Sequence, residues 1–159
     1  MTRMSVFEIT QRIMTVASEY EVRTDGEKEA SLIVKGTFLS STPSLSLNDG
    51  DKTVATLNGN MMKTKFVIAS GGEEKAVVNF PAVSLRKTMT LTVNGKGYHA
   101  TSGGISTEVF QCADNEGKVV LELRKEVGWR DRFKVETKEA LPREVAILTA
   151  VAIHSRYYE

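Results

Sequence analysis

One apolar stretch near the end of the chain limits how this protein can fold. Residues 144–154 read EVAILTAVAIH and carry one charged side chain, Glu144. The uncharged run VAILTAVAI has nine residues, about half of what a membrane-spanning helix needs. Its alternation alone would fit a strand, but Pro142 suits a first helical position, and Glu144 and Arg156 match the helix dipole. We therefore expect a helix over residues 142–157 that is apolar on every side and enclosed by protein.

Turn signals recur along the rest of the chain. The dipeptides are Asp25-Gly26, Asp49-Gly50, Gly71-Gly72, Asn94-Gly95 and Glu116-Gly117. Such pairs supply the positive φ angles of tight hairpin turns, and each one lies between runs rich in β-branched and apolar residues. The segments TMTLTV and VVLELR alternate apolar and polar residues as strands do. Together with the segments at 7–13 and 132–137, the hairpins predict about twelve short strands over residues 5–137.

The two predictions fit together in a barrel. A barrel of about eight strands is filled by its own side chains, so one of about twelve strands encloses a wider space. A helix of about 15 residues is roughly 22 Å long and about 10 Å across, which matches that space. We expect an all-β fold, a closed antiparallel barrel of about twelve strands with the C-terminal helix along its axis. Residues 1–159 are expected to form a single domain.

Three segments carry a resemblance to a known family. They are VRTDGEKEASLIVKG at 22–36, GWRDRFKVET at 128–137 and LPREVAILTAVAIHSRYY at 141–158. In these the chain resembles the LURP-one-related proteins, which share the tubby-like barrel with tubby C-terminal domains and phospholipid scramblases. The resemblance implies strands closed around a hydrophobic helix, and a binding role like that of tubby-like domains for phosphoinositides. The chain departs from the family where an Asp often flanks the final helix, and it lacks a cysteine-rich cluster before the barrel, so scrambling is not expected.

Composition narrows the compartment and the partners. Twenty-one Lys and Arg against 20 Asp and Glu leave a net charge of +1, which gives no global field to attract nucleic acid. The lone Cys112 cannot form an internal disulfide, and the N-terminal segment meets Glu8 before any apolar run typical of a signal peptide. We expect a cytoplasmic protein with no nucleic-acid partner and no transmembrane segment. The sequence leaves its oligomeric state open.

Residue types that carry metal or nucleophilic chemistry are few. One Cys and two His do not give a zinc-ligand spacing, and the segment NDGDK fits a calcium loop poorly because Leu45 and Leu47 fall at ligand positions. We expect no metal and no cofactor. His99 as a general base and Cys112 as a nucleophile are two hypotheses. The alternatives, a His in water at a strand end and a Cys packed in the barrel wall, are favoured because no pattern joins the two residues.

Two further residues have two interpretations each. His154 near the end of the helix is either a buried polar plug, which the helix C-terminus can stabilise when charged, or a proton-linked group. Trp129 is either an exposed anchor for a partner or membrane, or a ring folded over the rim of the barrel.

The segment RDRFK contains the candidate binding residues. In a strand, Phe133 and Val135 mark the core side, so Arg130, Arg132 and Lys134 face water.

A three-residue loop at 127–129 would pair Arg124 with Arg132 and Glu122 with Lys134. One hypothesis is that Arg124, Arg132 and Lys134 form a site for the phosphate or carboxylate of an anionic lipid headgroup, because two guanidinium groups can share one anion. The alternative is a solvated face on which nearby glutamates neutralise the arginines, and it is favoured because exposed ion pairs are common.

Three classes of function follow. The first is a non-enzymatic binding module for an anionic lipid headgroup or a protein partner on the outer barrel surface. The second is a protein-interaction scaffold with no small ligand, and the third is an enzyme with a site in the rim loops. The filled interior argues against the enzyme, because it leaves no room there for a catalytic pocket. We expect the first class, with the scaffold as the alternative.

Overall fold

The computed structural model describes residues 4–13, 17–24, 31–37, 42–83, 87–102, 109–125, 132–138 and 141–157. These residues form twelve strands followed by one helix. The strands are β1 (Met4–Ile13), β2 (Ala17–Thr24), β3 (Leu32–Thr37), β4 (Ser44–Asp49), β5 (Lys52–Gly59), β6 (Lys65–Ser70), β7 (Glu73–Asn79), β8 (Thr88–Val93), β9 (Lys96–Ser102), β10 (Val109–Ala113), β11 (Val119–Lys125) and β12 (Arg132–Lys138). The helix α1 spans Arg143–Tyr157.

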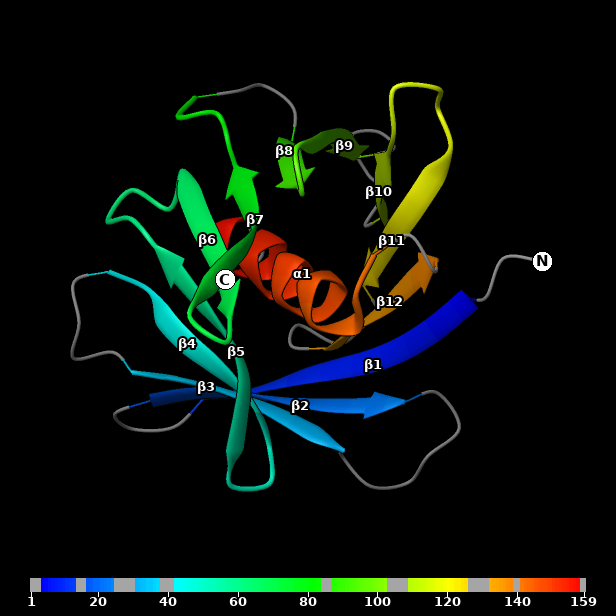
Figure 1. Cartoon of the computed structure of the whole chain (residues 1–159). Coiled ribbons are helices and arrows are strands. Elements are labelled where there is room, and N and C mark those ends of the chain that lie inside the picture. The colour runs from blue at the N-terminus through cyan, green and yellow to red at the C-terminus, as the bar shows by residue number, and fades with distance from the viewer. Residues whose placement is uncertain are drawn as a thin grey trace.

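Sequence neighbours pair in antiparallel order around the whole sheet. Each strand bonds to the strands before and after it, and β1 pairs with β12, which closes the barrel (Figure 1). Register pairs such as Phe7 with Val135 and Phe7 with Thr24 place β1 between the last strand and the second. The fold prediction of a closed antiparallel barrel of about twelve strands around a C-terminal helix is therefore confirmed.

The two ends of the barrel differ in their connections. Four predicted turns, β4–β5, β6–β7, β8–β9 and β10–β11, lie at the end where α1 begins, which we call the turn end. At the β8–β9 turn Asn94 has a φ of 50° and Gly95 a φ of 79°, the left-handed pair that a tight hairpin turn requires. The β5–β6 and β7–β8 connections lie at the other end, which we call the C-terminal end because α1 finishes there.

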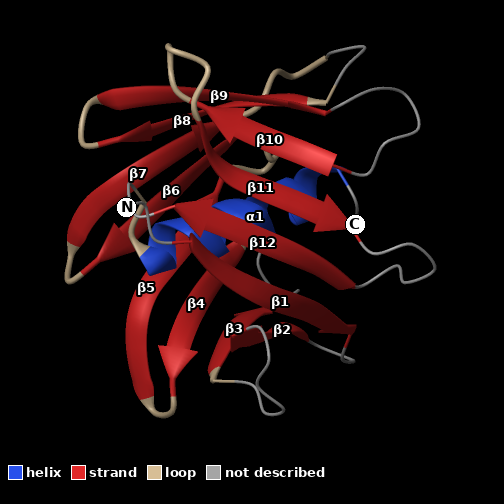
Figure 2. Cartoon of the chain, turned by 90° about the vertical axis from the view of Figure 1, so that its right-hand side faces the viewer, coloured by secondary structure: helices blue, strands red, loops and turns tan. Residues whose placement is uncertain are grey.

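The core consists of inward strand residues packed around α1. On β8, Met89, Leu91 and Val93 are buried while Thr90 and Thr92 are exposed, as the alternation predicts. Every residue of α1 from 145 to 155 is buried, and Figure 2 shows the helix crossing the space that the strands surround. A helix that lies inside a sheet on all sides has no polar face to keep in water. In the described residues no helix is long and apolar enough to cross a bilayer.

The last turn of α1 is tied to the barrel rim. The Tyr157 hydroxyl donates to the backbone oxygen of Thr88 at 2.7 Å and accepts from its backbone nitrogen at 3.2 Å. The ammonium of Lys63 donates to the backbone oxygen of Ser155 at 3.2 Å, where a carbonyl at a helix end has no partner within the helix. These bonds fix the depth of the helix in the barrel.

The buried helix leads to a stability prediction. Val151 is fully buried in α1 and Val83 is 93% exposed, so the same truncation can be compared in the two environments. We expect Val151→Ala to lower the free energy of unfolding by about 2 to 3 kcal/mol, because the lost apolar contact adds to the cavity left behind. We expect Val83→Ala to change it by less than about 0.5 kcal/mol. Urea denaturation measures both, and equal effects would contradict an enclosed helix.

Candidate functional site on the barrel wall

The three predicted site residues lie on the outside of neighbouring strands. Arg124 comes from β11, and Arg132 and Lys134 come from β12. Phe133 and Val135, which alternate with Arg132 and Lys134 along β12, are fully buried, so the predicted division into core and water faces is confirmed for these residues. Arg130, which was predicted on the water face, lies outside the described residues. Because α1 occupies the interior, this outer wall is where the predicted residues can meet a ligand.

The predicted pairing of the two strands is wrong by two residues. Arg124 stands opposite Lys134 instead of Arg132, and Glu122 stands opposite Glu136 instead of Lys134. A shift of two residues keeps every side chain on its own face, so the hydrophobic pattern cannot distinguish the two registers. The turn that would set the register, including Trp129, lies outside the described residues.

A basic row crosses four strands of the wall. Register pairs join Arg23 on β2, Glu8 on β1, Lys134 on β12 and Arg124 on β11. Glu8 accepts a hydrogen bond from Arg23 and lies 3.9 Å from the Nε of Arg132. Glu8 therefore forms ion pairs with Arg23 and Arg132. The side chain of Arg124 is 62% exposed and stands opposite Lys134.

An acidic row lies beside the basic row. Glu122 faces Glu136 on β12 and accepts two hydrogen bonds, from Gln111 at 2.9 Å and from Arg124 at 3.0 Å. The hydrogen bond from Gln111, followed by the bond and charge of Arg124, lowers the pKa of the Glu122 carboxyl. The lowered pKa favours the ionised carboxylate of Glu122, which accepts the hydrogen bond from the guanidinium of Arg124.

A β-bulge shapes the wall next to the acidic row. Cys112 pairs with Leu121 and Ala113 pairs with Val119, so Val120 is an extra residue on β11. A bulge bends its strand and increases the local twist. The hollow beside it has a volume of about 240 Å³. Its lining includes Gln111, Val119, Val120, Glu122, Glu136 and Lys138. The seam of β11 and β12 thus presents a cationic row above an open, partly acidic hollow.

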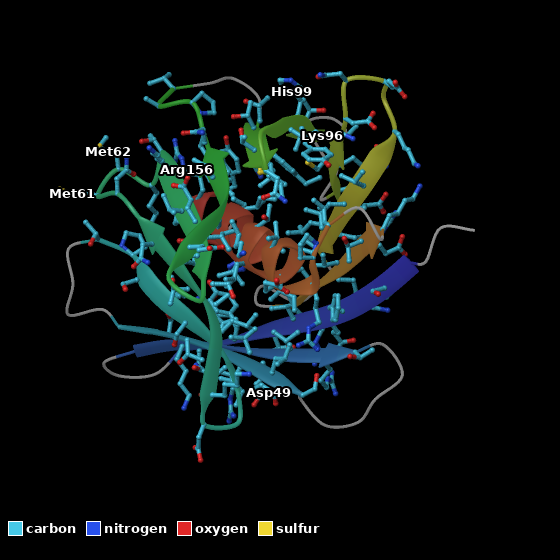
Figure 3. The ribbon with its side chains drawn as sticks, in the orientation of Figure 1. Asp49, Met61, Met62, Lys96, His99 and Arg156 are labelled. Atoms are coloured by element: carbon cyan, nitrogen blue, oxygen red, sulfur yellow. The ribbon has the colours of Figure 1, made fainter. Side chains whose placement is uncertain are left out.

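His99 and Cys112 do not converge on a common site. Cys112 is buried in the wall, as the packing alternative predicted, and burial raises its pKa to about 12. His99 is exposed on β9 at the outer surface, where Figure 3 labels it. Although the two strands are neighbours, His99 pairs with Ala113 and Cys112 pairs with Ala100, and their side chains face opposite sides of the sheet.

His154 is a buried polar group among aromatic rings. Its ring stacks on Phe133 at 4.9 Å between centroids and meets Tyr20 edge-on at 5.7 Å. Its Nδ1 lies 3.3 Å from the Tyr20 hydroxyl. The predicted polar plug is confirmed in its position, and these contacts bring β2 and β12 onto the last turns of the helix.

The segment NDGDK, which was compared with a calcium loop, forms a hairpin turn. Asp49 and Gly50 form the β4–β5 turn, with Gly50 at a φ of 61° (Figure 3). Within the described ranges, no group of three or more His, Cys, Asp or Glu side chains is arranged to hold a metal ion.

Sequence reasoning missed two residues that shape the wall, Glu8 and Gln111. The alternation of β1 places Glu8 on the water face, but only barrel closure reveals β12 and its arginine as neighbours. Gln111 had no signal beyond its outward position on β10, opposite Glu122.

Comparison of the chain with models of known protein families and with curated proteins gives no match. The barrel around a C-terminal helix is the fold that the resemblance to LURP-one-related proteins implies. Membership of that family stays a prediction.

The buried thiol gives the first test of this wall. We expect Cys112 to react with a thiol reagent at neutral pH at least about a hundredfold more slowly in the native protein than in urea, because burial removes access and suppresses the thiolate. A spectrophotometric assay with an aromatic disulfide measures both rates. Fast labelling of the folded protein would contradict the inward position of Cys112.

The acidic row gives a second test. Replacing Gln111→Ala removes the largest cause of the lowered pKa of Glu122, so we expect that pKa to rise toward the ordinary glutamate value. A carboxyl titration by carbon-detected nuclear magnetic resonance measures the change. Stability that depends on ionised Glu122 is present above the unfolded-state pKa and is lost as the pH falls through the lower folded-state pKa. An unchanged titration would show that Gln111 does not hold the carboxylate.

Proposed function

We propose that the chain is a non-enzymatic binding module, of the LURP-one-related or tubby-like type, that recognises an anionic lipid headgroup on the outer wall of its barrel. The observation that carries this proposal is the direct opposition of Arg124 and Lys134 on adjacent strands. Like charges directly opposite each other destabilise a sheet. A bound anion between the two cations would turn that repulsion into attraction.

The geometry of a cross-strand pair suits a phosphate group. Opposed residues have Cβ atoms about 4.5 to 5.5 Å apart, so the ends of two long side chains can reach one small anion. Arg124 donates to Glu122 through one terminal nitrogen, and a guanidinium has five N–H donors in all. Donors are therefore left for a phosphate, and Lys134 adds a second positive charge.

Arg132 has a supporting role in this proposal. Its Nε lies beside Glu8, which also accepts from Arg23, so Arg132 adds positive charge near the site while being held by the wall. Arg124 and Lys134 are the residues that we expect to touch the ligand.

The filled interior supports binding on the outer surface. Residues 145–153 of α1 are all buried against the inward faces of the strands. A headgroup can therefore reach the basic row without entering the barrel. The proposal places the protein in the cytoplasm, where the anionic leaflet of a membrane attracts basic residues.

A protein partner is the second candidate, and the adjoining charge rows favour it. The basic row with Arg124 lies next to the acidic row of Glu122 and Glu136, which together form an alternating pattern. A partner surface with the complementary pattern would dock in one register.

Flotation with vesicles that contain phosphoinositides tests the lipid proposal. We expect Arg124→Glu with Lys134→Glu to weaken binding about 30-fold or more, since each basic residue near the membrane contributes about 1 kcal/mol. The control is Lys52→Glu with Lys118→Glu, which makes the same change in net charge with exposed residues at the turn end.

The control variant should float like the wild type. Absence of flotation by the wild type, or equal loss in the two double variants, would contradict a specific anion site on the wall. Flotation that is lost in neither variant would do the same.

A further inference from the structure

The exposed apolar side chains of the described residues gather at one end of the barrel. The large hydrophobic residues that stand out in solvent are Met61, Met62 and Val83, with exposed fractions of 68%, 71% and 93%. Met61 and Met62 belong to the β5–β6 connection and Val83 to the β7–β8 connection. Both connections lie at the C-terminal end. We propose that this end docks on an anionic lipid bilayer, with Met61 and Met62 inserted among the lipids.

The turn that carries the methionines is held by other residues. The backbone nitrogen of Asn60 donates to the oxygen of Lys65 at 3.0 Å, and the backbone oxygen of Asn60 accepts from the nitrogen of Lys63 at 3.1 Å. The Asn60 side-chain oxygen accepts from the backbone nitrogens of Thr64 at 2.8 Å and Lys65 at 3.3 Å. Lys63 takes the left-handed conformation, with a φ of 55°. Because Asn60 closes the turn, the structure does not need apolar side chains at positions 61 and 62.

The two connections are anchored to the same turn of α1. Lys63 donates to the backbone oxygen of Ser155, and Arg156 donates to two backbone oxygens of the β7–β8 connection at 3.2 and 3.3 Å. The connections also meet each other, since the backbone nitrogen of Phe80 donates to the oxygen of Thr64 at 2.7 Å. The exposed apolar residues therefore stand on one braced platform.

The charge of this half of the barrel matches an anionic surface. Residues 52–107 contain seven basic and two acidic residues, a net charge of +5 in a chain whose net charge is +1. Glu73 and Glu74 begin β7 at the turn end, where Lys52, Lys75 and Lys96 also lie. At the C-terminal end Lys65 begins β6 and Lys87 directly precedes β8. In the sequence, Met61 and Met62 are followed by Lys63 and Lys65 with no acid between them.

The shape favours a bilayer over a protein partner. Figure 3 shows Met61 and Met62 projecting outward from the edge of the barrel, with Arg156 nearer the middle of the view. A stable protein interface buries about 800 Å² on each partner, far more than two side chains at a hairpin tip supply. A bilayer interface accepts a small apolar tip and meets the neighbouring lysines with lipid phosphates, while their aliphatic stems stay among apolar groups.

This inference rests on the proposed function in one respect only, since both have an anionic membrane as the target. Met61 and Met62 lie between β5 and β6, whereas Arg124 and Lys134 lie on the opposite side of the barrel, on β11 and β12. The two sites can therefore be altered separately.

A fluorescent label on the tip tests insertion directly. Met62→Cys is labelled with a nitrobenzoxadiazole group, which brightens when it leaves water, while the native Cys112 stays unlabelled because it is buried. The matched control carries the label on Asp51→Cys, an exposed position in a turn at the other end. With vesicles of phosphatidylcholine and phosphatidylserine, we expect a severalfold rise in emission for the label at position 62 and none at position 51.

The label gives two outcomes that overturn the inference. In the first, the emission of the label at position 62 is the same with and without vesicles, at vesicle concentrations that float the protein. In the second, the labels at positions 62 and 51 brighten equally. Failure of the wild type to bind these vesicles also overturns it.

A second variant measures what the methionines contribute. We expect Met61→Ser with Met62→Ser to weaken partition into the mixed vesicles at least about tenfold, because two apolar side chains lose their burial in the interface. The melting temperature should stay unchanged, since Asn60 holds the turn. Equal partition of this variant and the wild type overturns the inference.

A soluble headgroup tests the basic row independently of the methionines. We expect the binding of inositol trisphosphate, measured by calorimetric titration, to depend on Arg124 and Lys134 and not on the methionines. Loss of headgroup binding with the tip label still inserting would overturn the proposed function alone. Headgroup binding without insertion would overturn the tip alone.

Discussion

Enclosure of an apolar helix is the constraint on which the rest of this structure depends. The helix α1 has no face that suits water, and its residues from 145 to 155 are buried. Here a closed wall of strands covers it on all sides, and each strand contributes apolar residues at alternate positions. Ala146, Ala150 and Ala152 keep the helix narrow within that wall. Closure also removes exposed sheet edges, which would otherwise be sites of aggregation.

Filling the interior moves recognition to the surface. On the wall, outward residues of neighbouring strands form rows, because the antiparallel register sets which residues of two adjacent strands stand opposite each other. One row places Arg124 against Lys134 and the next places Glu122 against Glu136. Each like-charge pair costs stability by itself, and the hydrogen bonds from Gln111 and Arg124 to Glu122 offset part of that cost. The basic pair is likewise offset in part, because Arg124 donates to Glu122 and Lys134 stands opposite Glu8 on β1. The anion that we propose would lie between the two cations, where no carboxylate of the described wall stands in register.

The asymmetry of the two ends follows from the direction of the helix. At the turn end the hairpins are short and built from Gly, Asn and Asp. At the C-terminal end the connections must reach the last turn of α1, and Lys63, Arg156 and Tyr157 bind them to it. An end that is braced by the helix can hold apolar residues in solvent without depending on them for its own shape.

The sequence by itself determined the fold class, the strand number, the helix and the face of most strand residues. The expected helix at 142–157 and the observed Arg143–Tyr157 agree, because a stretch apolar on all sides has few structural solutions. The sequence also placed Arg124, Arg132 and Lys134 on the water face. Only the tertiary structure decided that Arg124 meets Lys134 and that Glu8, from the first strand, lies beside Arg132 near the end of the chain. The physical reason is that side-chain alternation repeats every two residues. Registers that differ by two bury the same residues, and the choice between them depends on turns and on barrel closure.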